Sequence, residues 1–328
     1  MEEKIGILGS GGWGICLSIL LSKKNNKITL WEPIKENYEI LIKERENKVY
    51  FPEVKIPENV FITNSIEETL KNSENLIITV RSTFFKETIE TIEKHYSGQK
   101  VLVGTKGMEV KTKKFFSEII EEKKFIKNYG IISGPTIARE IILGFPTAAV
   151  IASNCNALSL YLQKLLSSDI FRVYITKDIK GVQVGGSFKN VIAIGAGIVD
   201  GLQLGMNTKA SYLTRGLNEM IKVGRKLGGK EKTLRGLSGI GDLITTSFSK
   251  YSRNRSFGEG IIREGKENYL EKTKMVIEGI YATDVYYTLS HRLKVELPIT
   301  SSIYRIIFSN SSPIEEINYL MKRKLKRE

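Results

Sequence analysis

The chain has 328 residues, a formal net charge of +14, and a globular composition with 41% hydrophobic and 26% charged residues. Because this length exceeds what one hydrophobic core usually supports, we expect two domains. The basic excess would suit nucleic acid, an acidic membrane surface or small anionic substrates, but the lysines are scattered and no basic block alternates with aromatic residues. Nucleic-acid binding is therefore not expected. The basic tail at residues 322–328 is interpreted as a solvated helix end, with a contact surface as the alternative.

The two cysteines, Cys16 and Cys155, lack the spacing of a metal site, so we predict neither a metal centre nor a disulfide framework. The N-terminus begins with two acidic residues after the methionine and enters a strand, unlike a signal peptide. The longest apolar stretch, around residues 190–202, contains glycines and Asp200 and is predicted to be too short to cross a bilayer. We expect a cytoplasmic protein without a transmembrane segment, for which weak association with acidic membrane surfaces is still open.

From residue 4 to about residue 175, short β-branched runs alternate with segments of helical periodicity. The expected strands are KIGILG, KITLWE, NVFIT, NLIITV, KVLVGT, YGIIS, TAAVIA and FRVYIT. Helical patterns lie between most of them, at residues 34–45, 84–95, 112–123 and 156–167. This alternation predicts an α/β fold with a Rossmann-type, doubly wound and mostly parallel sheet over residues 1–178.

The strand patterns stop at about residue 180. Helical patterns follow at residues 181–200, 207–228, 254–264, 278–290, 299–308 and 314–324. The second domain, residues 179–328, is therefore predicted to be all-α.

Gly9, Gly11 and Gly14 form a G-x-G-x-x-G pattern directly after the first expected strand and at the start of a helix. The first glycine permits a tight turn, the second lets the backbone approach a pyrophosphate, and the third lets helix and strand pack closely. The free N–H groups and the positive dipole end of the helix then face the phosphates. In this context the pattern predicts dinucleotide binding, although a structural turn is the alternative.

Glu32 ends the second expected strand, 23 residues after Gly9. An acid at that place accepts hydrogen bonds from the adenosine ribose and repels a 2′-phosphate, which favours NAD over NADP. Two alternatives stay open, because Glu32 could be a surface acid at a strand end and Lys35 nearby could soften the preference.

A dehydrogenase that acts on an alcohol needs a group to take and return the hydroxyl proton. His95 and His291 lie in charged, helical surface patterns without a motif, so lysines are the better candidates. Lys106 lies in VGTKGM at the carboxyl end of a strand, where open α/β sheets bind ligands. Lys189 is the lysine of the apolar, glycine-rich segment GGSFKNVIAIGAG, and burial of a lysine favours its neutral form, as a proton shuttle requires. A long lysine side chain can also extend to solvent, so spacing alone does not decide whether Lys189 has a catalytic role.

Residues 236–258, GLSGIGDLITTSFSKYSRNRSFG, hold a dense group of polar side chains. Asp242 follows a glycine-rich turn, where it could hold a lysine or a substrate hydroxyl. The residues after it offer hydroxyl, amide and guanidinium groups near a helix start, which suit a phosphate: Thr246, Ser252, Arg253, Asn254 and Arg255.

With these motifs in order, nearly the whole chain resembles the NAD(P)-dependent glycerol-3-phosphate dehydrogenase family, bacterial type. The matching segments are GSGGWG, FPEVKIPENV, VGTKGM, SGPTIARE, GGSFKNVIAIGAGIVDGLQLGMNTKASYLTRGLNEM, GLSGIGDL, SRNRSFG, MVIEG and LPITSSIY. The resemblance implies a Rossmann domain followed by an all-helical domain, and reversible reduction of dihydroxyacetone phosphate by NADH or NADPH to sn-glycerol 3-phosphate for phospholipid synthesis. It also suggests a homodimer.

The resemblance further implies a role for each matched residue. Lys189 would be the catalytic proton donor and acceptor, Lys106 would polarise the substrate oxygen close to the cofactor, and Asn190 and Asp242 would shape the catalytic site together with Thr246. The implied substrate contacts are Lys106, Gly134, Thr136, Lys189, Asp242, Thr246, Ser252, Arg253 and Asn254. The implied cofactor contacts, beside the motif glycines and Glu32, are Gly12, Trp13, Lys106, Ala138, Arg253, Val276 and Glu278.

Several positions depart from the family pattern: Glu32, Arg81, Met206 and Phe248. The first puts NADPH use in doubt, and Arg81 lies near the expected nicotinamide path.

Two other interpretations of the function stay open. One is a related 3-hydroxyacid or 6-phosphogluconate-type dehydrogenase, for which GLSGIGDL followed by SRNR is not required. The other is a non-enzymatic dinucleotide-binding sensor, which need not keep Lys106, Lys189 and Asp242 together.

Overall fold

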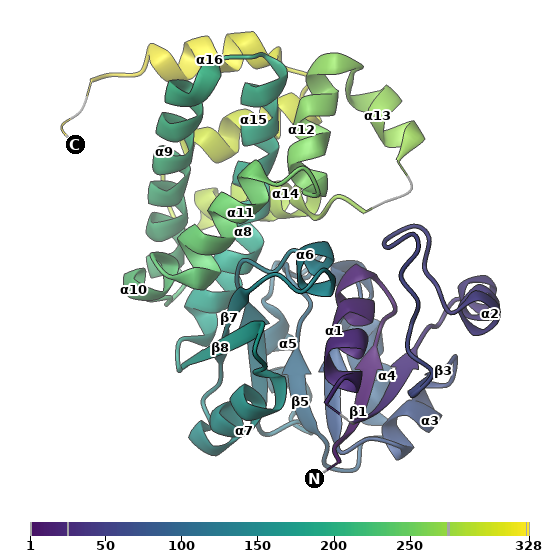
Figure 1. Cartoon of the computed structure of the whole chain (residues 1–328). Helices are drawn as coiled ribbons and strands as arrows, with labels where there is room; N and C mark the ends of the chain where they lie inside the picture. Colours follow the sequence, from purple (N-terminus) through teal and green to yellow (C-terminus); the bar gives the residue numbers. More distant parts are fainter. Residues whose placement is uncertain (1, 25, 274–275, 326, 328) are drawn as a thin grey trace. The chain divides into compact units, whose positions relative to one another are not determined.

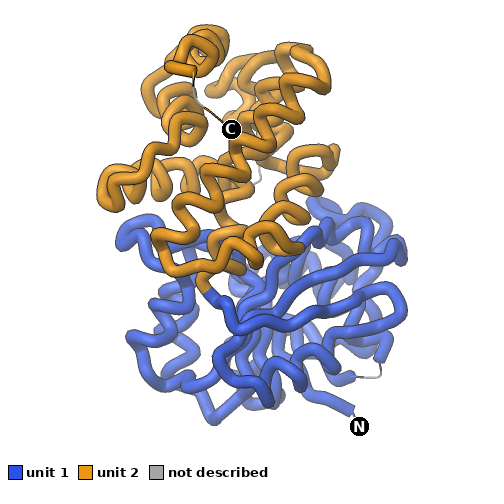
Figure 2. The backbone as a smooth tube through the Cα atoms, turned by 90° about the vertical axis from the view of Figure 1, so that its left-hand side faces the viewer, with its two compact units in different colours: residues 1–179 blue, residues 180–328 orange. Residues whose placement is uncertain are grey.

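The computed structural model describes residues 2–24, 26–273, 276–325 and 327 (Figure 1). The chain forms two compact units, residues 1–179 and 180–328, which Figure 2 distinguishes by colour. Unit 1 holds the sheet, and unit 2 is built from helices. Two residues of the basic tail at 322–328, those at positions 326 and 328, lie outside the described residues.

Unit 1 is organised around an eight-stranded sheet with the order β3-β2-β1-β4-β5-β6-β7-β8. Neighbouring strands are parallel except β6 and β7, which pair antiparallel. The strands are β1 (Lys4–Leu8), β2 (Lys27–Trp31), β3 (Val60–Thr63), β4 (Asn75–Ile78), β5 (Lys100–Val103), β6 (Tyr129–Ser133), β7 (Thr147–Ala152) and β8 (Phe171–Thr176). The predicted mostly parallel sheet is confirmed, and each of the expected strand segments forms a strand.

Helices cover this sheet, as Figure 1 shows. They are α1 (Gly12–Ser22), α2 (Lys35–Glu44), α3 (Ile66–Lys71), α4 (Phe85–Glu93), α5 (Phe116–Lys123), α6 (Ala138–Ile142) and α7 (Asn156–Leu166), with a short 3₁₀ helix at Ser82–Phe84. The strand order reverses at β1, which pairs with β2 on one side and β4 on the other. Open α/β sheets bind ligands at such a point, outside the carboxyl ends of the strands.

The central strands are buried on both faces, which explains their nearly continuous apolar sequences. Every residue of β4 and β6 is buried, and Ile5, Ile7 and Leu8 of β1 have no exposed surface. The strong apolar signal made these strands predictable from the sequence.

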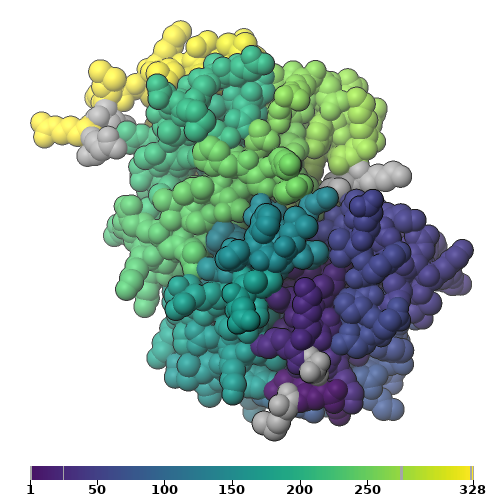
Figure 3. Space-filling view, in the orientation of Figure 1, coloured from purple at the N-terminus to yellow at the C-terminus, as the bar shows by residue number. Residues whose placement is uncertain are grey.

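Among the described residues of unit 2, the regular elements are helical, as predicted. They are α8 (Ile179–Gly201), α9 (Gly205–Lys226), α10 (Glu231–Leu234), a π-helical turn (Leu237–Gly241), α11 (Asp242–Phe248), α12 (Arg253–Arg263), α13 (Lys266–Lys272), α14 (Glu278–Arg292), α15 (Pro298–Phe308) and α16 (Pro313–Met321). In the space-filling view, the C-terminal helix α16 lies at the surface of the unit (Figure 3), with Met321 78% exposed.

Helix α8 is the centre of unit 2, because every side chain from residue 181 to residue 199 is buried. The sequence predicted an apolar stretch too short to cross a bilayer, and that prediction of its length is wrong. The helix has 23 residues and is long and apolar enough for a membrane span, but its whole apolar window is buried inside the structure. Such burial is typical of the core helix of a globular unit.

Candidate active site

The glycine motif connects β1 to α1 and has the geometry that a pyrophosphate loop requires. Gly9 has a φ of +109°, and a Cβ at Gly14 would lie 1.8 Å from the carbonyl oxygen of Gly9. Among the described residues, no heavy atom beyond the adjoining backbone lies within 4 Å of a Cβ built on Gly11, the N-cap of α1, so the backbone there is open to a ligand. These features fit a dinucleotide at the helix N-terminus.

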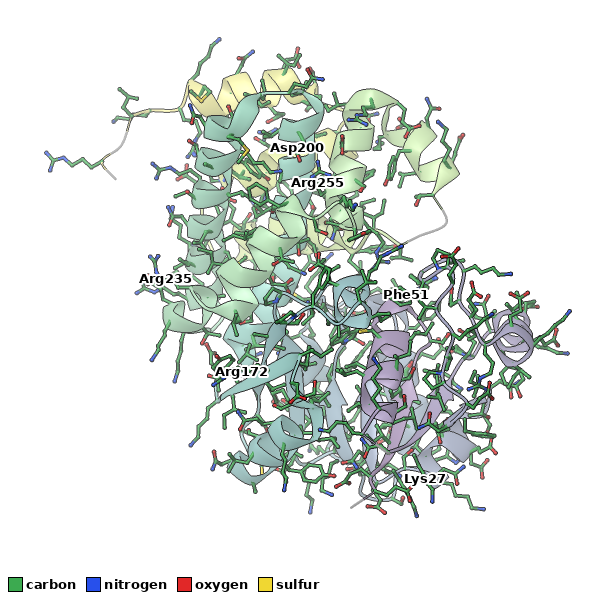
Figure 4. The ribbon with its side chains drawn as sticks, viewed as in Figure 1. Lys27, Phe51, Arg172, Asp200, Arg235 and Arg255 are labelled. Atoms are coloured by element: carbon green, nitrogen blue, oxygen red, sulfur yellow. The ribbon has the colours of Figure 1, made fainter. Side chains whose placement is uncertain are left out.

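Two neighbours of the motif help to enclose it. The ring of Phe51, labelled in Figure 4, and the ring of Tyr50 contact the Cβ position of Gly12. The indole nitrogen of Trp13 is buried, has no hydrogen-bond acceptor among the described residues, and lies 2.8 Å from the Cβ position of Gly104. Trp13, a residue inside the motif, thus packs its indole against the chain directly after β5.

Glu32, directly after β2, is only 6% exposed and is not a surface acid. Its carboxylate accepts hydrogen bonds from the Ser10 hydroxyl and, at 2.8 Å, from the backbone N–H of Ile34. Ser10 belongs to the glycine motif, so the acid is fixed beside that loop. Ser10 could not be predicted from the sequence as a functional residue, because a serine between two glycines gives no signal of its own.

Lys106 follows β5, and its ammonium donates to the carbonyl oxygen of Gly134 at 3.1 Å and to the Thr136 hydroxyl at 3.3 Å. Gly134 and Thr136 follow β6, the parallel neighbour of β5, so the carboxyl ends of the two strands bring the three residues together. Gly134 has a φ of +143°, and a Cβ there would lie 3.0 Å from the Ala149 backbone. Ala138 begins α6 directly after this loop.

Lys189 of α8 is the centre of the polar group in unit 2. Its ammonium donates to Asp242 Oδ1 at 2.5 Å and to Thr246 Oγ1 at 2.9 Å, and Thr246 in turn lies 3.3 Å from the same carboxylate oxygen. Lys189 is 7% exposed and Asp242 is 2% exposed. The burial of the lysine is therefore matched by a buried opposite charge, which such an ammonium requires.

The π-helical turn at 237–241 places Asp242 against α8. Gly185 of α8 allows the approach, because a Cβ there would lie 2.2 Å from the carbonyl oxygen of Ser238. Asp242 and Thr246 occupy adjacent turns of the same face of α11, at a spacing of four residues. Both side chains thus reach one ammonium.

A tyrosine of α14 packs against the turn of α8 that carries Lys189. Tyr286 of α14 is fully buried, lies 2.5 Å from the Ser187 hydroxyl, and packs its ring edge-on against Phe188. Burial raises the pKa of Tyr286 well above its usual range. Its hydroxyl stays protonated and serves the packing of α14 on α8.

Asn190 links α8 to two further helices. Asn254 of α12 donates to Asn190 Oδ1 at 2.9 Å and accepts a hydrogen bond of 2.8 Å from the backbone N–H of Gly279 in α14. Both asparagines are buried. Asn190 and Asn254 thus form one buried network at the junction of α8, α12 and α14.

The remaining predicted residues of unit 2 lie around the start of α12. Ser252 is the N-cap, and its hydroxyl accepts from the backbone N–H of Arg255 at 3.2 Å. Arg253 is the first residue of the helix and donates to the carbonyl oxygen of Val276 at 3.1 Å. Glu278 is the first residue of α14. A helix N-terminus with an arginine at its first position suits an anion.

A metal was not predicted, and within residues 2–24, 26–273, 276–325 and 327 no group of three or more His, Cys, Asp or Glu side chains could hold one.

Comparison with known proteins gives a consistent result. Family models described as the N-terminus and the C-terminus of NAD-dependent glycerol-3-phosphate dehydrogenase match residues 4–159 and 178–318. The chain is 42% identical over 330 residues to a glycerol-3-phosphate dehydrogenase [NAD(P)+] of Thermoanaerobacter, with 99% of this chain and 98% of that protein covered. A protein of the same description from Carboxydothermus hydrogenoformans is 41% identical over 332 residues, with 99% of this chain and 98% of that protein covered.

A solved structure is similar as well. The crystal structure of glycerol-3-phosphate dehydrogenase from Coxiella burnetii superimposes with a TM-score of 0.94 at 34% identity, covering 98% of this chain and 99% of that chain. The ternary structure of a D-mandelate dehydrogenase with NADH, at 12% identity and a TM-score of 0.64, is similar in fold alone.

Proposed function

The chain belongs to the NAD-dependent glycerol-3-phosphate dehydrogenase family, and on that premise we propose the residues that carry out its reaction. It is an NAD(P)-dependent oxidoreductase, and the reaction is the reversible reduction of dihydroxyacetone phosphate to sn-glycerol 3-phosphate. The observation that carries the proposal is the buried ammonium of Lys189 between Asp242 and Thr246.

Lys189 is the proton donor in reduction and the acceptor in oxidation. A nicotinamide cofactor, when bound, would supply the hydride for C2 of the substrate. The ammonium of Lys189 gives a proton to the oxygen as negative charge develops on it, and a positioned acid of this kind contributes about 10²–10⁴-fold to a rate. Asp242 and Thr246 hold the ammonium in one orientation, because each accepts one of its hydrogen bonds.

The substrate phosphate is assigned to the start of α12. Ser252, Arg253 and Asn254 offer a hydroxyl, a guanidinium and an amide there, at the positive end of an eleven-residue helix. Lys106, with Gly134 and Thr136, is proposed to bind and polarise the substrate oxygen. Asn190 shapes the site through its hydrogen bond with Asn254.

The cofactor is assigned to the glycine loop, with contacts from Gly9, Gly11, Gly12, Trp13 and Gly14. Contacts from Lys106, Ala138, Arg253, Val276 and Glu278 complete the proposed set. Glu32 accepts the ribose hydroxyls and repels a 2′-phosphate, so NADH is proposed as the preferred cofactor.

We propose a cytoplasmic homodimer whose product supplies phospholipid synthesis. Association with acidic membranes would be weak and sensitive to salt, because surface charges are screened over about 10 Å at 0.1 M salt.

The test follows nicotinamide oxidation by the purified protein, with NADH and NADPH in parallel and with dihydroxyacetone phosphate or a 3-keto acid as the acceptor. The proposal predicts oxidation with dihydroxyacetone phosphate alone, and faster with NADH. Oxidation with the 3-keto acid alone would support the related dehydrogenases. Cofactor binding without any oxidation would support the non-enzymatic sensor. Equal rates with NADH and NADPH would support the reaction and refute the role of Glu32 in selecting NADH.

A further inference from the structure

Asp200, one residue before the end of α8, joins three helices (Figure 4). Its Oδ2 accepts a hydrogen bond from Arg255 Nε of α12 at 2.6 Å, and both of its carboxylate oxygens accept from Lys209 Nζ of α9, at 2.9 and 2.8 Å. The exposed fractions of the Lys209, Arg255 and Asp200 side chains are 6%, 18% and 20%. Ion pairs this sheltered are screened less by salt than surface pairs.

This cluster holds both ends of the loop that carries a proposed substrate residue. The loop, residues 249–252, connects Phe248 at the end of α11 with Arg253 at the start of α12 and includes Ser252. On one side, the Lys209 ammonium lies 4.3 Å from the centroid of the Phe248 ring, a cation–π contact. On the other side, Arg255 is bonded to Asp200. Asp200 is therefore linked through Lys209 to Phe248, the last residue before the loop. It is also bonded directly to Arg255, in the first turn after the loop.

Close backbone packing between α8 and α12 makes the position of α12 sensitive to this cluster. A Cβ at Gly197 would lie 1.9 Å from the carbonyl oxygen of Arg255, and a Cβ at Gly258 would lie 1.8 Å from the carbonyl oxygen of Ile194. The two helices thus touch through their main chains, where few alternative registers fit. The first turn of α12 meets α8 at two places: Asn254 bonds to Asn190, next to Lys189, and Arg255 bonds to Asp200 near the end of α8.

We propose that Asp200 is a positioning residue for substrate binding, which fixes the 249–252 loop and the first turn of α12 through Lys209 and Arg255. This inference rests on the proposed function, because it assumes that the phosphate of the substrate binds at that turn. Asp200 acts on substrate affinity and leaves the proton transfer at Lys189 unchanged.

The test compares Asp200→Asn with Arg255→Lys and a matched control, Glu259→Gln. Asp200→Asn removes the charge and keeps the side-chain shape. Arg255→Lys keeps the charge and loses the Nε donor. Glu259 also pairs with Arg255, at 3.3 Å, but both residues belong to α12. Removing the Glu259 charge therefore leaves the ion pair between α12 and α8 in place. Circular dichroism confirms that each variant is folded before kinetics are measured.

Asp200→Asn and Arg255→Lys are expected to raise the KM for dihydroxyacetone phosphate by about tenfold or more, the loss in affinity that follows when one hydrogen bond to a charged group is weakened. The kcat at saturating substrate should stay within about threefold of wild type, the pattern of lost uniform binding. Glu259→Gln should leave KM unchanged. An unchanged KM in folded Asp200→Asn, or a similar rise in Glu259→Gln, would overturn the inference. If Asp200→Asn does not fold, amide hydrogen exchange of residues 249–256 in Arg255→Lys decides, since the loss of a direct phosphate contact alone would not change exchange in the free protein.

Amide hydrogen exchange of residues 249–256 gives a readout without activity. Exchange in this segment should be faster in Asp200→Asn than in wild type, and no faster in Glu259→Gln. A wild-type protein without activity toward dihydroxyacetone phosphate would count against the proposed function, whereas unchanged exchange in an active Asp200→Asn protein would count against the role of Asp200.

Discussion

Replacing Lys189 by Met, alone and together with Asp242→Asn, separates the proposed catalytic role of this pair from its structural role. In Lys189→Met the ammonium that neutralises Asp242 is lost while the carboxylate, 2% exposed, is still buried. Breaking a buried pair in this way costs about 3–5 kcal/mol of unfolding free energy. In the double variant both charges are gone, and the free energy of unfolding should recover about 2 kcal/mol of this loss, since a buried amide without a partner costs about 1–3 kcal/mol, less than a buried charge without one.

Activity should not return with stability. Without the ammonium, kcat for dihydroxyacetone phosphate reduction should fall by about 10²–10⁴-fold in both variants. Urea unfolding followed by far-ultraviolet circular dichroism measures the first effect, and nicotinamide absorbance measures the second. Trp13 and Trp31, the two tryptophans, both belong to unit 1, so their fluorescence is an internal control for damage outside unit 2. A double variant with wild-type kcat would refute Lys189 as the proton donor. A double variant as unstable as Lys189→Met would refute the cost assigned to the unpaired Asp242 carboxylate.

Three further variants test separate parts of the account. Glu219→Gln tests a buried carboxyl group: burial raises the pKa of Glu219 from 4.5 to about 7. Because the folded state binds this proton more tightly than the unfolded state, the proton's contribution to the free energy of unfolding is full below pH 4.5 and is lost as the pH rises through 7. Urea unfolding at pH 5 and pH 8 should therefore show a loss of up to about 3 kcal/mol in wild type that is absent in Glu219→Gln, and equal losses in both would contradict it. Glu32→Ser should raise the ratio of kcat/KM for NADPH over NADH by about tenfold, because a like charge is removed; an unchanged ratio would exclude Glu32 as the selector. Gly14→Ala, whose methyl would lie 1.8 Å from the Gly9 carbonyl oxygen, should weaken NADH binding by about tenfold or more in a fluorescence titration, and wild-type affinity would contradict the loop geometry.

The sheet of unit 1 could be predicted from the sequence because its strands are short apolar runs between helical patterns. The antiparallel pairing of β7 with β6 could not, because both segments are equally apolar and nothing local encodes direction. In unit 2 the long helices were predicted near their observed bounds. The π-helical turn at 237–241 and the short α11 after it were missed, since a glycine-rich run with few apolar positions gives no periodicity.

The candidate site shows the same division. The glycine motif and the pairing of Lys189 with an acid were accessible from the sequence, because one lysine in an apolar helix requires a partner. The contact of Asp200 with Lys209 and Arg255 was not, since these residues lie on three helices and resemble ordinary surface charges. Long-range contacts of this kind follow from packing, which no local pattern records.

The central claim is hydride transfer from a nicotinamide cofactor to C2 of dihydroxyacetone phosphate. The most direct measurement incubates the purified protein with NADH and dihydroxyacetone phosphate and quantifies both the cofactor oxidised and the sn-glycerol 3-phosphate formed. Wild type is expected to give equal amounts of oxidised cofactor and sn-glycerol 3-phosphate. Lys189→Met is expected to give far less of both over the same time. Oxidation of NADH without sn-glycerol 3-phosphate, or no oxidation by a protein that binds NADH, would contradict the central claim.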